Sequence, residues 1–202
     1  MGKAALRILG FEVKGLAAVG LWLARRRHGV PPGATAVTYA KEQYFTMSLM
    51  MFAMVVEAVV VDLLLVAMSA PAGVRYAVLV LDVYGLLFGL ALVAACVTRP
   101  HVVTADEVRI RYGAYLDVRV PRHLIASVHT SRSYHERAMI AVADGRLTVA
   151  VASTANVTIR LTEPITFERP LGAVAEAHTI RFFADRPEIL VTALRAEDAV
   201  RP

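Results

Sequence analysis

Three carboxylic acids stand inside the two most apolar stretches of the chain. Glu57 and Asp62 lie in residues 47–70, and Asp82 lies in residues 76–97. Neither stretch contains Lys, Arg or His, and an ionised carboxylate without a partner is costly in an apolar environment. We therefore expect these acids to be protonated, hydrated or bonded to a partner.

Acids in this setting suit more than one role. They could line a proton or cation pathway or a metal site, which would need an oligomer because two helices cannot enclose a pore. Alternatively, neutral acids could bond across helices and fix the hairpin register or an oligomer, or they could contact another membrane protein. Counting residues places Asp62 and Asp82 at similar depth. We favour the structural role.

The elements that carry these acids have the length of membrane spans. The two stretches hold 24 and 22 residues, and about 20 apolar residues cross a hydrocarbon core. The five residues between them, 71–75, include Pro and Gly, so the two helices should be antiparallel neighbours. The sequence therefore predicts a two-helix transmembrane hairpin over residues 47–98; a buried hairpin in a soluble protein is the less favoured alternative.

Two glycines mark the packing face of the second helix. Gly85 and Gly89 have the small-xxx-small spacing that allows helices to approach closely. Asp82 falls on the same stripe, so we expect it to face the first helix and not lipid.

Composition and charge place the chain in a membrane. Hydrophobic residues make up 57% of the 202 residues, charged residues make up 19%, and mean hydropathy is +0.55. Basic residues precede the first span and follow the second, whereas the intervening loop has only Arg75. The positive-inside rule then puts both termini in the cytoplasm. The Arg-, Ala- and Val-rich composition indicates a bacterial source and therefore the inner membrane.

The N-terminal arm, residues 1–46, reads as an amphipathic helix, a basic cluster and a Pro-rich linker. Its longest uninterrupted apolar run is too short to span a bilayer. We expect the helix to lie on the inner leaflet, with Trp22 at headgroup depth and Arg25, Arg26 and Arg27 attracted to anionic lipid. A helix packed against its own cytoplasmic domain or a partner subunit is the competing interpretation.

Residues 99–202 change to short alternating runs typical of strands. Asp144-Gly145 joins two such runs and predicts a tight hairpin turn. No helical segment separates the runs until Pro187, where a helix capped by Asp185 should begin. The expected fold is a membrane helical hairpin plus a β-rich cytoplasmic domain, an antiparallel small barrel or sandwich with a C-terminal helix. Residues 165–178 are irregular and leave the strand number open.

The first strands of this domain follow one another in a characteristic succession: Val108–Tyr112 leading into Gly113, then Val118-Arg119-Val120-Pro121, Leu124-Ile125 and Ser127-Val128. In this succession the domain resembles the bacterial pleckstrin-homology-like family, whose members follow one or more membrane helices. The similarity covers roughly residues 99–197. It implies a membrane-tethered interaction module with no shared catalytic residues.

The sequence contains no recognisable catalytic or cofactor motif. It lacks a phosphate-binding glycine loop, a dinucleotide fingerprint and a zincin motif, and one cysteine cannot form a Cys-rich metal site. His129 and His135 fit no metal or nucleophile template and read as loop residues. Residues 99–202 hold 14 Arg and 12 acids, a balance that argues against nucleic-acid binding.

We therefore expect a non-enzymatic scaffold or accessory protein without metal or cofactor. Its partners would be membrane lipid and either further copies of itself or another membrane protein. An oligomeric carboxylate-lined proton or cation pathway is the alternative function.

Overall fold

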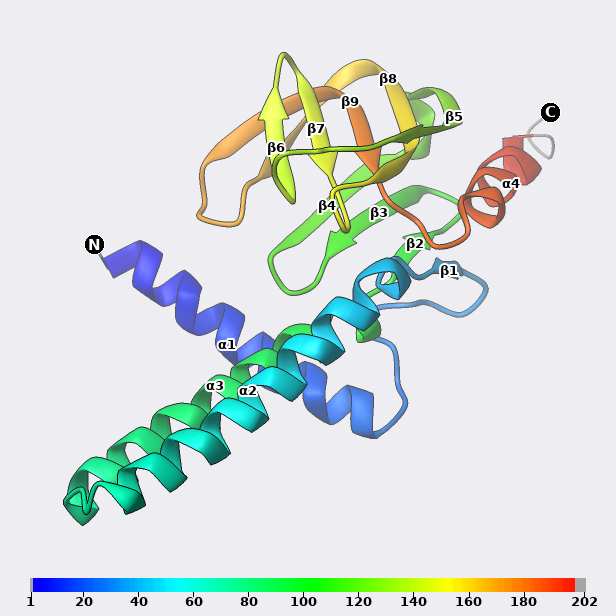
Figure 1. The fold of residues 1–202 in the computed structure, drawn as a ribbon. Helices are drawn as coiled ribbons and strands as arrows, with labels where there is room; N and C mark the ends of the chain where they lie inside the picture. The colour runs from blue at the N-terminus through cyan, green and yellow to red at the C-terminus, as the bar shows by residue number, and fades with distance from the viewer. Residues whose placement is uncertain (1, 199–202) are drawn as a thin grey trace.

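The computed structural model describes residues 2–198. Two long helices project from a β-rich region, and a third helix crosses them near their junction with that region (Figure 1). The helices are α1 (Gly2–Leu23), α2 (Lys41–Ala67), α3 (Ala72–Thr98) and α4 (Pro187–Asp198), with a 3₁₀ turn, η1, at Arg122–Leu124.

Helices α2 and α3 form the expected antiparallel hairpin. Each has 27 residues, which corresponds to about 40 Å, and both are long and apolar enough to cross a membrane. The connection is shorter than the predicted loop: α2 ends at Ala67, Ser69 takes a positive φ of 52°, and Pro71 precedes α3. Arg75, expected in the loop, therefore belongs to the first turn of α3.

The first sheet contains strands from both sides of the hairpin. Its order is β1-β2-β3-β4, all antiparallel. The strands are β1 (Thr35–Val37), β2 (His101–Val103), β3 (Glu107–Tyr112) and β4 (Leu116–Pro121). Strand β1 precedes the hairpin and pairs with β2, which follows it. Part of the segment that the sequence placed in a linker is thus an edge strand.

The second sheet has five strands in the order β5-β8-β9-β7-β6. They are β5 (Ile125–Ser133), β6 (Ile140–Ala143), β7 (Arg146–Val149), β8 (Ala155–Glu168) and β9 (Val174–Phe182). The turn predicted at Asp144-Gly145 is confirmed: both residues have positive φ and join the β6–β7 hairpin.

The expectation of a wholly antiparallel sheet is wrong, because β7 and β9 run parallel. After β7 the chain skips one position to form β8, and β9 then fills the gap between them. Strand β9 is antiparallel to β8, which fixes its direction relative to β7. The irregular residues 165–178 belong to this long β8–β9 hairpin, whose register shifts between Arg160 and Ile165, next to Pro164, which cannot donate to the ladder.

The two sheets and α4 enclose one hydrophobic core. Val108, Ile110, Ile159 and Ile180 are fully buried between the sheets, and Leu190 of α4 joins them. The C-terminal helix thus packs against the β-rich region as expected. Asp185, which the sequence predicted as the cap of this helix, instead bonds the start of α2.

Asp185 marks the junction between the β-rich region and the hairpin. Its Oδ1 accepts a hydrogen bond from the backbone N–H of Lys41 at 3.1 Å, at the start of α2. Its own N–H donates to the carbonyl oxygen of Thr38 at 2.8 Å. A carboxylate can cap any helix N-terminus within reach, and here α2 is that helix.

Candidate functional site

The packing register of the hairpin corrects the expected depth of the acids. A Cβ added at Gly85 would lie 3.2 Å from Met54, and one added at Gly89 would lie 2.7 Å from Met51. Extending this antiparallel register by one turn places Asp82 at the level of Glu57, not Asp62. Residue counting failed because the connection is shorter and the helices are longer than the sequence suggested. The two glycines do lie where α3 approaches α2.

Asp62 has a basic partner that the sequence analysis did not expect. The Arg75 guanidinium donates to Oδ1 of Asp62 at 3.0 Å and to its Oδ2 at 3.3 Å. Arg75 reaches the carboxylate because α3 begins at Ala72 and its first turn faces α2. This pair closes the hairpin near its tip.

The other two acids have no such partner. Glu57 is exposed on α2, whereas Asp82 is half-buried. Within residues 2–198, neither forms a hydrogen bond or an ion pair. Among these described residues no group of three or more His, Cys, Asp or Glu side chains is placed to hold a metal ion.

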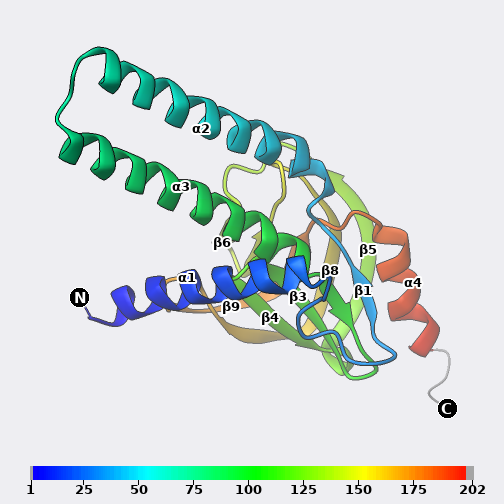
Figure 2. The same cartoon turned by 90° about the horizontal axis from the view of Figure 1, so that it is seen from below.

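Helix α1 packs on α3 through small residues. Ala18 is fully buried with Ala94 and Ala95 of α3, and a Cβ added at Gly15 would touch that of Ala91 at 3.1 Å. Figure 2 shows α1 alongside α3, with α2 on the other side. This packing on the second hairpin helix was not among the expectations for the N-terminal arm, which named the inner leaflet, the cytoplasmic domain or a partner subunit.

The opposite face of α1 is apolar and uncovered. It presents five large side chains on the stripe that the helical spacing had singled out: Leu6, Leu9, Val13, Leu16 and Leu23. Trp22 is 40% exposed at the end of the helix, and Arg25, Arg26 and Arg27 follow it in exposed positions. Packing on α3 thus leaves available the face that a lipid surface would need.

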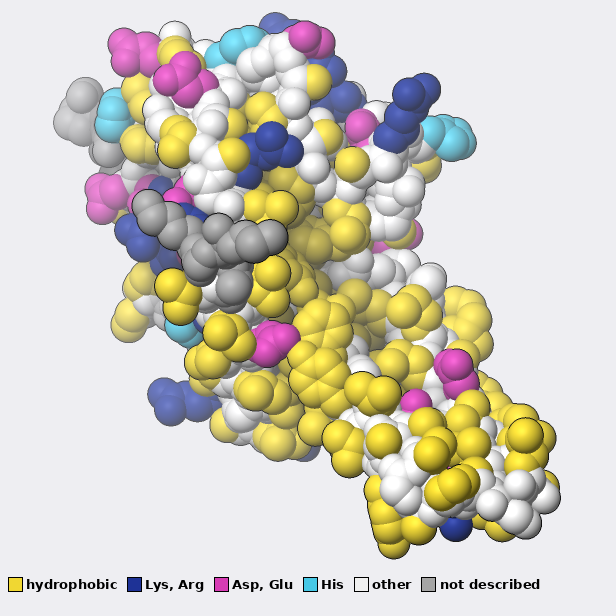
Figure 3. All heavy atoms as spheres, turned by 90° about the vertical axis from the view of Figure 1, so that its left-hand side faces the viewer, with side chains coloured by type: hydrophobic (Ala, Val, Ile, Leu, Met, Phe, Trp, Pro, Cys, Tyr) yellow, Lys and Arg dark blue, Asp and Glu magenta, His cyan; other side chains and the backbone are white. Residues whose placement is uncertain are grey.

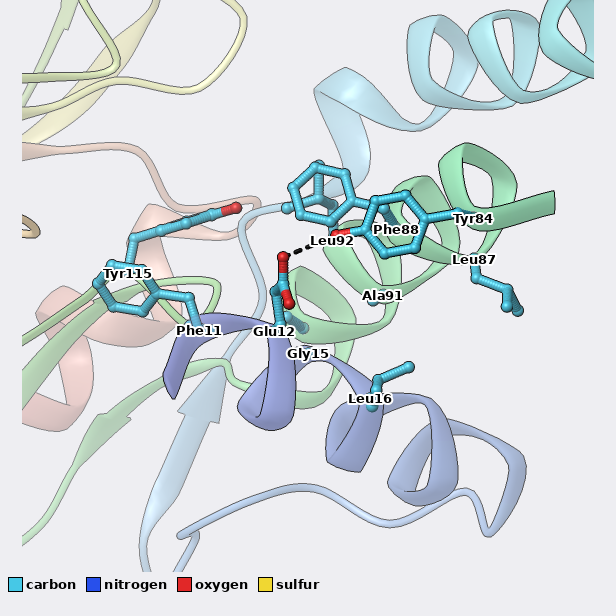
Figure 4. Close-up of a pocket in the computed structure, with 12 residues that line it drawn as sticks. Phe11, Glu12, Gly15, Leu16, Tyr84, Leu87, Phe88, Ala91, Leu92 and Tyr115 are labelled. Atoms are coloured by element: carbon cyan, nitrogen blue, oxygen red, sulfur yellow. Dashed lines mark hydrogen bonds between the residues drawn. The ribbon is translucent and has the colours of Figure 1, made fainter. Parts of the chain in front are cut away.

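A small pocket lies in the angle between α1 and α3 (Figure 4). It has a volume of about 140 Å³ and a largely apolar lining that includes Phe11, Leu16 and Phe88. The Tyr84 hydroxyl donates to Oε1 of Glu12 at 2.7 Å across it. Phe11 meets Tyr115 of the β3–β4 turn edge to face, with ring centroids 5.0 Å apart. Contacts between residues that line the pocket therefore connect α1 to both the hairpin and the β-rich region.

Arg111 connects the N-terminal arm to the first sheet. Its side chain is 2% exposed, and it donates to the carbonyl oxygens of His28 at 2.9 Å and Gly29 at 3.0 Å. Its Nε lies 3.5 Å from Oδ1 of Asp117, a carboxylate that also pairs with Arg109. The segment after α1 is therefore held against β3 by a buried guanidinium.

His101, beside Arg111, also connects separate segments of the chain. Its Nδ1 accepts a hydrogen bond from the Arg111 backbone N–H at 3.1 Å, so its Nε2 carries the proton and donates to the Phe183 carbonyl oxygen at 2.8 Å. The ring packs at a tilt against Tyr39 and edge to face against Phe182. Complete burial lowers the pKa of His101 to about 4. It is a neutral structural histidine linking β2, β3 and the segment before α4.

The basic residues near the β5–β6 connection do not gather into one site. Arg122 is buried and donates to the carbonyl oxygens of Thr104 and Leu194. Arg132 pairs with Glu42 of α2 at 3.1 Å and lies over the Tyr134 ring. His135 is exposed with a positive φ of 65°.

Sequence reasoning missed the junction residues for a physical reason. Arg111 alternates with Ile110 and Tyr112, a pattern that predicts an outward side chain. All three are buried because the segment after α1 covers the other face of β3. Nothing local in the sequence indicates this cover.

Comparisons with protein-family models, with curated proteins and with solved structures found no match for this chain. No family is therefore identified for it. The structure itself shows two long apolar helices followed by a β-rich region that ends in a helix.

Proposed function

We propose that the protein is a membrane-anchored scaffold or accessory protein. The hairpin anchors it, and the β-rich region, a pleckstrin-homology-like interaction module, is presented at the inner face of a bacterial membrane. The observation that carries the proposal is the uncovered apolar surface of the hairpin. Figure 3 shows hydrophobic side chains dominating the hairpin, whereas charged and polar side chains are interspersed over the β-rich region.

The surface area exposed by the hairpin favours a lipid environment over water. Leu63 is 62% exposed and Leu81 is 68% exposed, and many similar side chains surround them. Water-soluble proteins rarely leave a contiguous apolar patch larger than a few hundred Å² uncovered. Helices satisfy their own backbone hydrogen bonds, so this surface is compatible with a hydrocarbon core.

Strand pairing supports the orientation. Strand β1 precedes the hairpin and pairs with β2 beyond it, so both ends of the hairpin must lie on the same side of any membrane that it crosses. The basic residues near those ends favour the cytoplasmic side under the positive-inside rule, which supports the proposed orientation.

The arrangement of α1 supports a second attachment. The helix crosses α3 near the β-rich region (Figure 1), and its exposed leucines form one face. An apolar face of this kind binds the headgroup–acyl boundary, and the adjacent Arg25–Arg27 cluster would add attraction to anionic lipid.

Orientation is tested by labelling in intact inverted and right-side-out bacterial membrane vesicles. In a Cys96→Ser background, single cysteines are introduced at Gly73 in the hairpin tip or at Ala126 on exposed β5. An impermeant maleimide should label position 126 only in inverted vesicles and position 73 only in right-side-out vesicles. Labelling of both positions from the same side, or release of the protein by carbonate washing, would refute the proposal.

The lipid contact of α1 is tested with Trp22, the single tryptophan of the chain. In vesicles containing brominated lipid, its fluorescence should be quenched most by bromines near the headgroups. Replacing Leu9 and Leu16 with Gln should reduce quenching, whereas replacing exposed Ala17 with Gln should not. Equal quenching in all three proteins would contradict a lipid-bound stripe.

One observation favours a second function, the carboxylate-lined pathway. Glu57 and Asp82 share a depth in the hairpin, and neither has a partner within the described residues. In an oligomer these acids could line a hydrated path. Reconstituted vesicles should then show proton flux that Glu57→Gln abolishes while assembly is unchanged. Absence of flux in the native protein would leave the scaffold as the function.

A further inference from the structure

The outer face of the five-stranded sheet gathers arginines from three adjacent strands. Strand register places Arg160 of β8 and Arg146 of β7 on either side of Thr179 of β9. The next row places Arg181 of β9 between Thr158 and Thr148. Guanidinium and hydroxyl groups therefore alternate across the face.

This face is hollowed into a groove of about 510 Å³. Its volume falls within the range of roughly 300–1,000 Å³ that is usual for small-molecule sites. The lining is mainly polar and comes from β5, β7, β8 and β9: His129, Ser131, Arg146, Thr158, Arg160, Leu161, His178, Thr179 and Arg181.

Gly145 and the His178 ring lie together at the rim of the groove. The His178 Nδ1 lies 3.0 Å from the Thr179 hydroxyl oxygen, and its ring packs over the β6–β7 turn. A Cβ added at Gly145 would come within 2.6 Å of that ring. The glycine required for the turn, with a φ of 66°, is also the residue that leaves room for the imidazole.

Positive charge in the groove is poorly balanced by the chain itself. Arg181 lies 3.6 Å from Glu136. Arg146 and Arg160 are exposed, and within residues 2–198 neither has an ion-pair partner. Arg181 lies on the strand between them, diagonal to both, and like charges this close repel one another, so an anion placed among the three relieves an unfavourable interaction as well as forming new bonds.

The groove points away from the hairpin. In Figure 1 the four-stranded sheet lies between the five-stranded sheet and the helices, and the groove is on the side opposite that core. With the hairpin inserted as proposed, the groove faces away from the membrane that holds it. The occupant is then expected to come from solution.

We propose that this groove binds a soluble ligand that carries phosphate groups. Arginine presents a planar fork that matches phosphate oxygens, and hydroxyl donors complete the coordination. Strands lie about 4.8 Å apart, so Arg146 and Arg160, two strands apart, are separated by about 10 Å at the backbone. That spacing suits a ligand with more than one phosphate. The anion site goes beyond the scaffold function, whereas the choice of a soluble ligand over a lipid headgroup rests on the proposed membrane insertion.

Sodium triphosphate is the probe for the test, titrated calorimetrically into the full-length protein in a neutral detergent at low salt. The native protein should bind it, and the double variant Arg146→Gln/Arg160→Gln should bind at least tenfold more weakly. Arg119→Gln, on exposed β4 of the other sheet, is the matched control and should bind as the native protein does. No binding by the native protein, or equal loss in the control, would overturn the proposal.

A second experiment separates the phosphate source. The protein is reconstituted in nanodiscs of neutral lipid or of phosphatidylglycerol, and triphosphate affinity is measured in both. Equal affinity supports a site that faces solution. Loss of triphosphate binding in phosphatidylglycerol nanodiscs would show that headgroups occupy the groove and would refute a soluble ligand.

Discussion

The hairpin and the β-rich region contain similar apolar side chains, but the hairpin exposes them and the β-rich region buries them. Valine and leucine are mostly exposed along α2 and α3, whereas Val108, Ile159 and Leu190 are fully buried within the β-rich region. The β-rich region thus provides its own apolar environment. The hairpin leaves its apolar side chains uncovered, which favours apolar surroundings over water.

Their polar groups show the same contrast. The buried Arg111 and His101 find hydrogen-bond partners inside the chain. In the hairpin, Asp62 is paired with Arg75, but Glu57 and Asp82 find nothing comparable within the described residues. These buried side chains are therefore held by other parts of the chain, whereas two acids of the hairpin are left without a partner among the described residues. Three predictions examine this difference.

The largest effect is expected at the junction of the two regions. Arg111→Ala removes the donor to the carbonyl oxygens of His28 and Gly29, which holds the segment after α1 against β3. A hydrogen bond from a charged donor contributes about 1.5–3 kcal/mol, and because two are lost we expect a cost of about 3–5 kcal/mol. Thermal unfolding in detergent should show this loss for the β-rich region. The exposed control Arg119→Ala should change stability by less than about 0.5 kcal/mol, and a similar cost in both variants would contradict the role of Arg111.

The next effect concerns pH and the β-rich region alone. Burial lowers the pKa of His101 from 6.5 to about 4, so the unfolded chain binds a proton that the folded chain refuses. Stability is therefore full above pH 6.5 and falls as pH drops toward 4, by on the order of 3 kcal/mol.

Melting temperatures of the native protein and His101→Gln between pH 4 and 8 measure this contribution. The variant should be less stable at neutral pH but should lose much less on acidification. His123→Gln, an exposed histidine, should keep the native pH dependence. Parallel profiles for the native protein and His101→Gln would refute the assignment.

The smallest effect is expected in the hairpin. Gly89→Leu places a large side chain where even a Cβ would meet the Met51 sulfur at 2.7 Å. Overpacking a close contact costs about 1–3 kcal/mol, and the flexible Met51 side chain keeps the cost at the low end, so α3 should move away from α2 while the β-rich region keeps its melting temperature. Cross-linking of cysteines at positions 54 and 85, in a Cys96→Ser background, reports the separation. Gly73→Leu, where a Cβ meets nothing within 4 Å, should leave cross-linking intact; equal loss would contradict close packing at Gly89.

Sequence reasoning succeeded where a feature is local. The two apolar helices follow from run length, the β6–β7 turn from Asp144-Gly145, and the C-terminal helix from the spacing after Pro187. Each depends on neighbours along the chain, so periodicity and turn chemistry are enough to indicate it.

It failed where the partner is distant in sequence. Strand β1 has three residues, too few for a periodic signal, and exists because β2 lies beside it. Asp185 has the chemistry to cap a helix, but the choice of α2 was made by packing. The arginines of the groove come from β7, β8 and β9, and only strand order brings them to one face.

The pairing of β1 with β2 has a consequence for how the protein is made. Strand β1 leaves the ribosome before α2 and α3, and its partner emerges only after them. The two strands can therefore pair only after both apolar helices have been synthesised. Under the proposed topology, that pairing also requires both ends of the hairpin to lie on the same side of the membrane, so closure of the first sheet and correct insertion of the hairpin depend on each other.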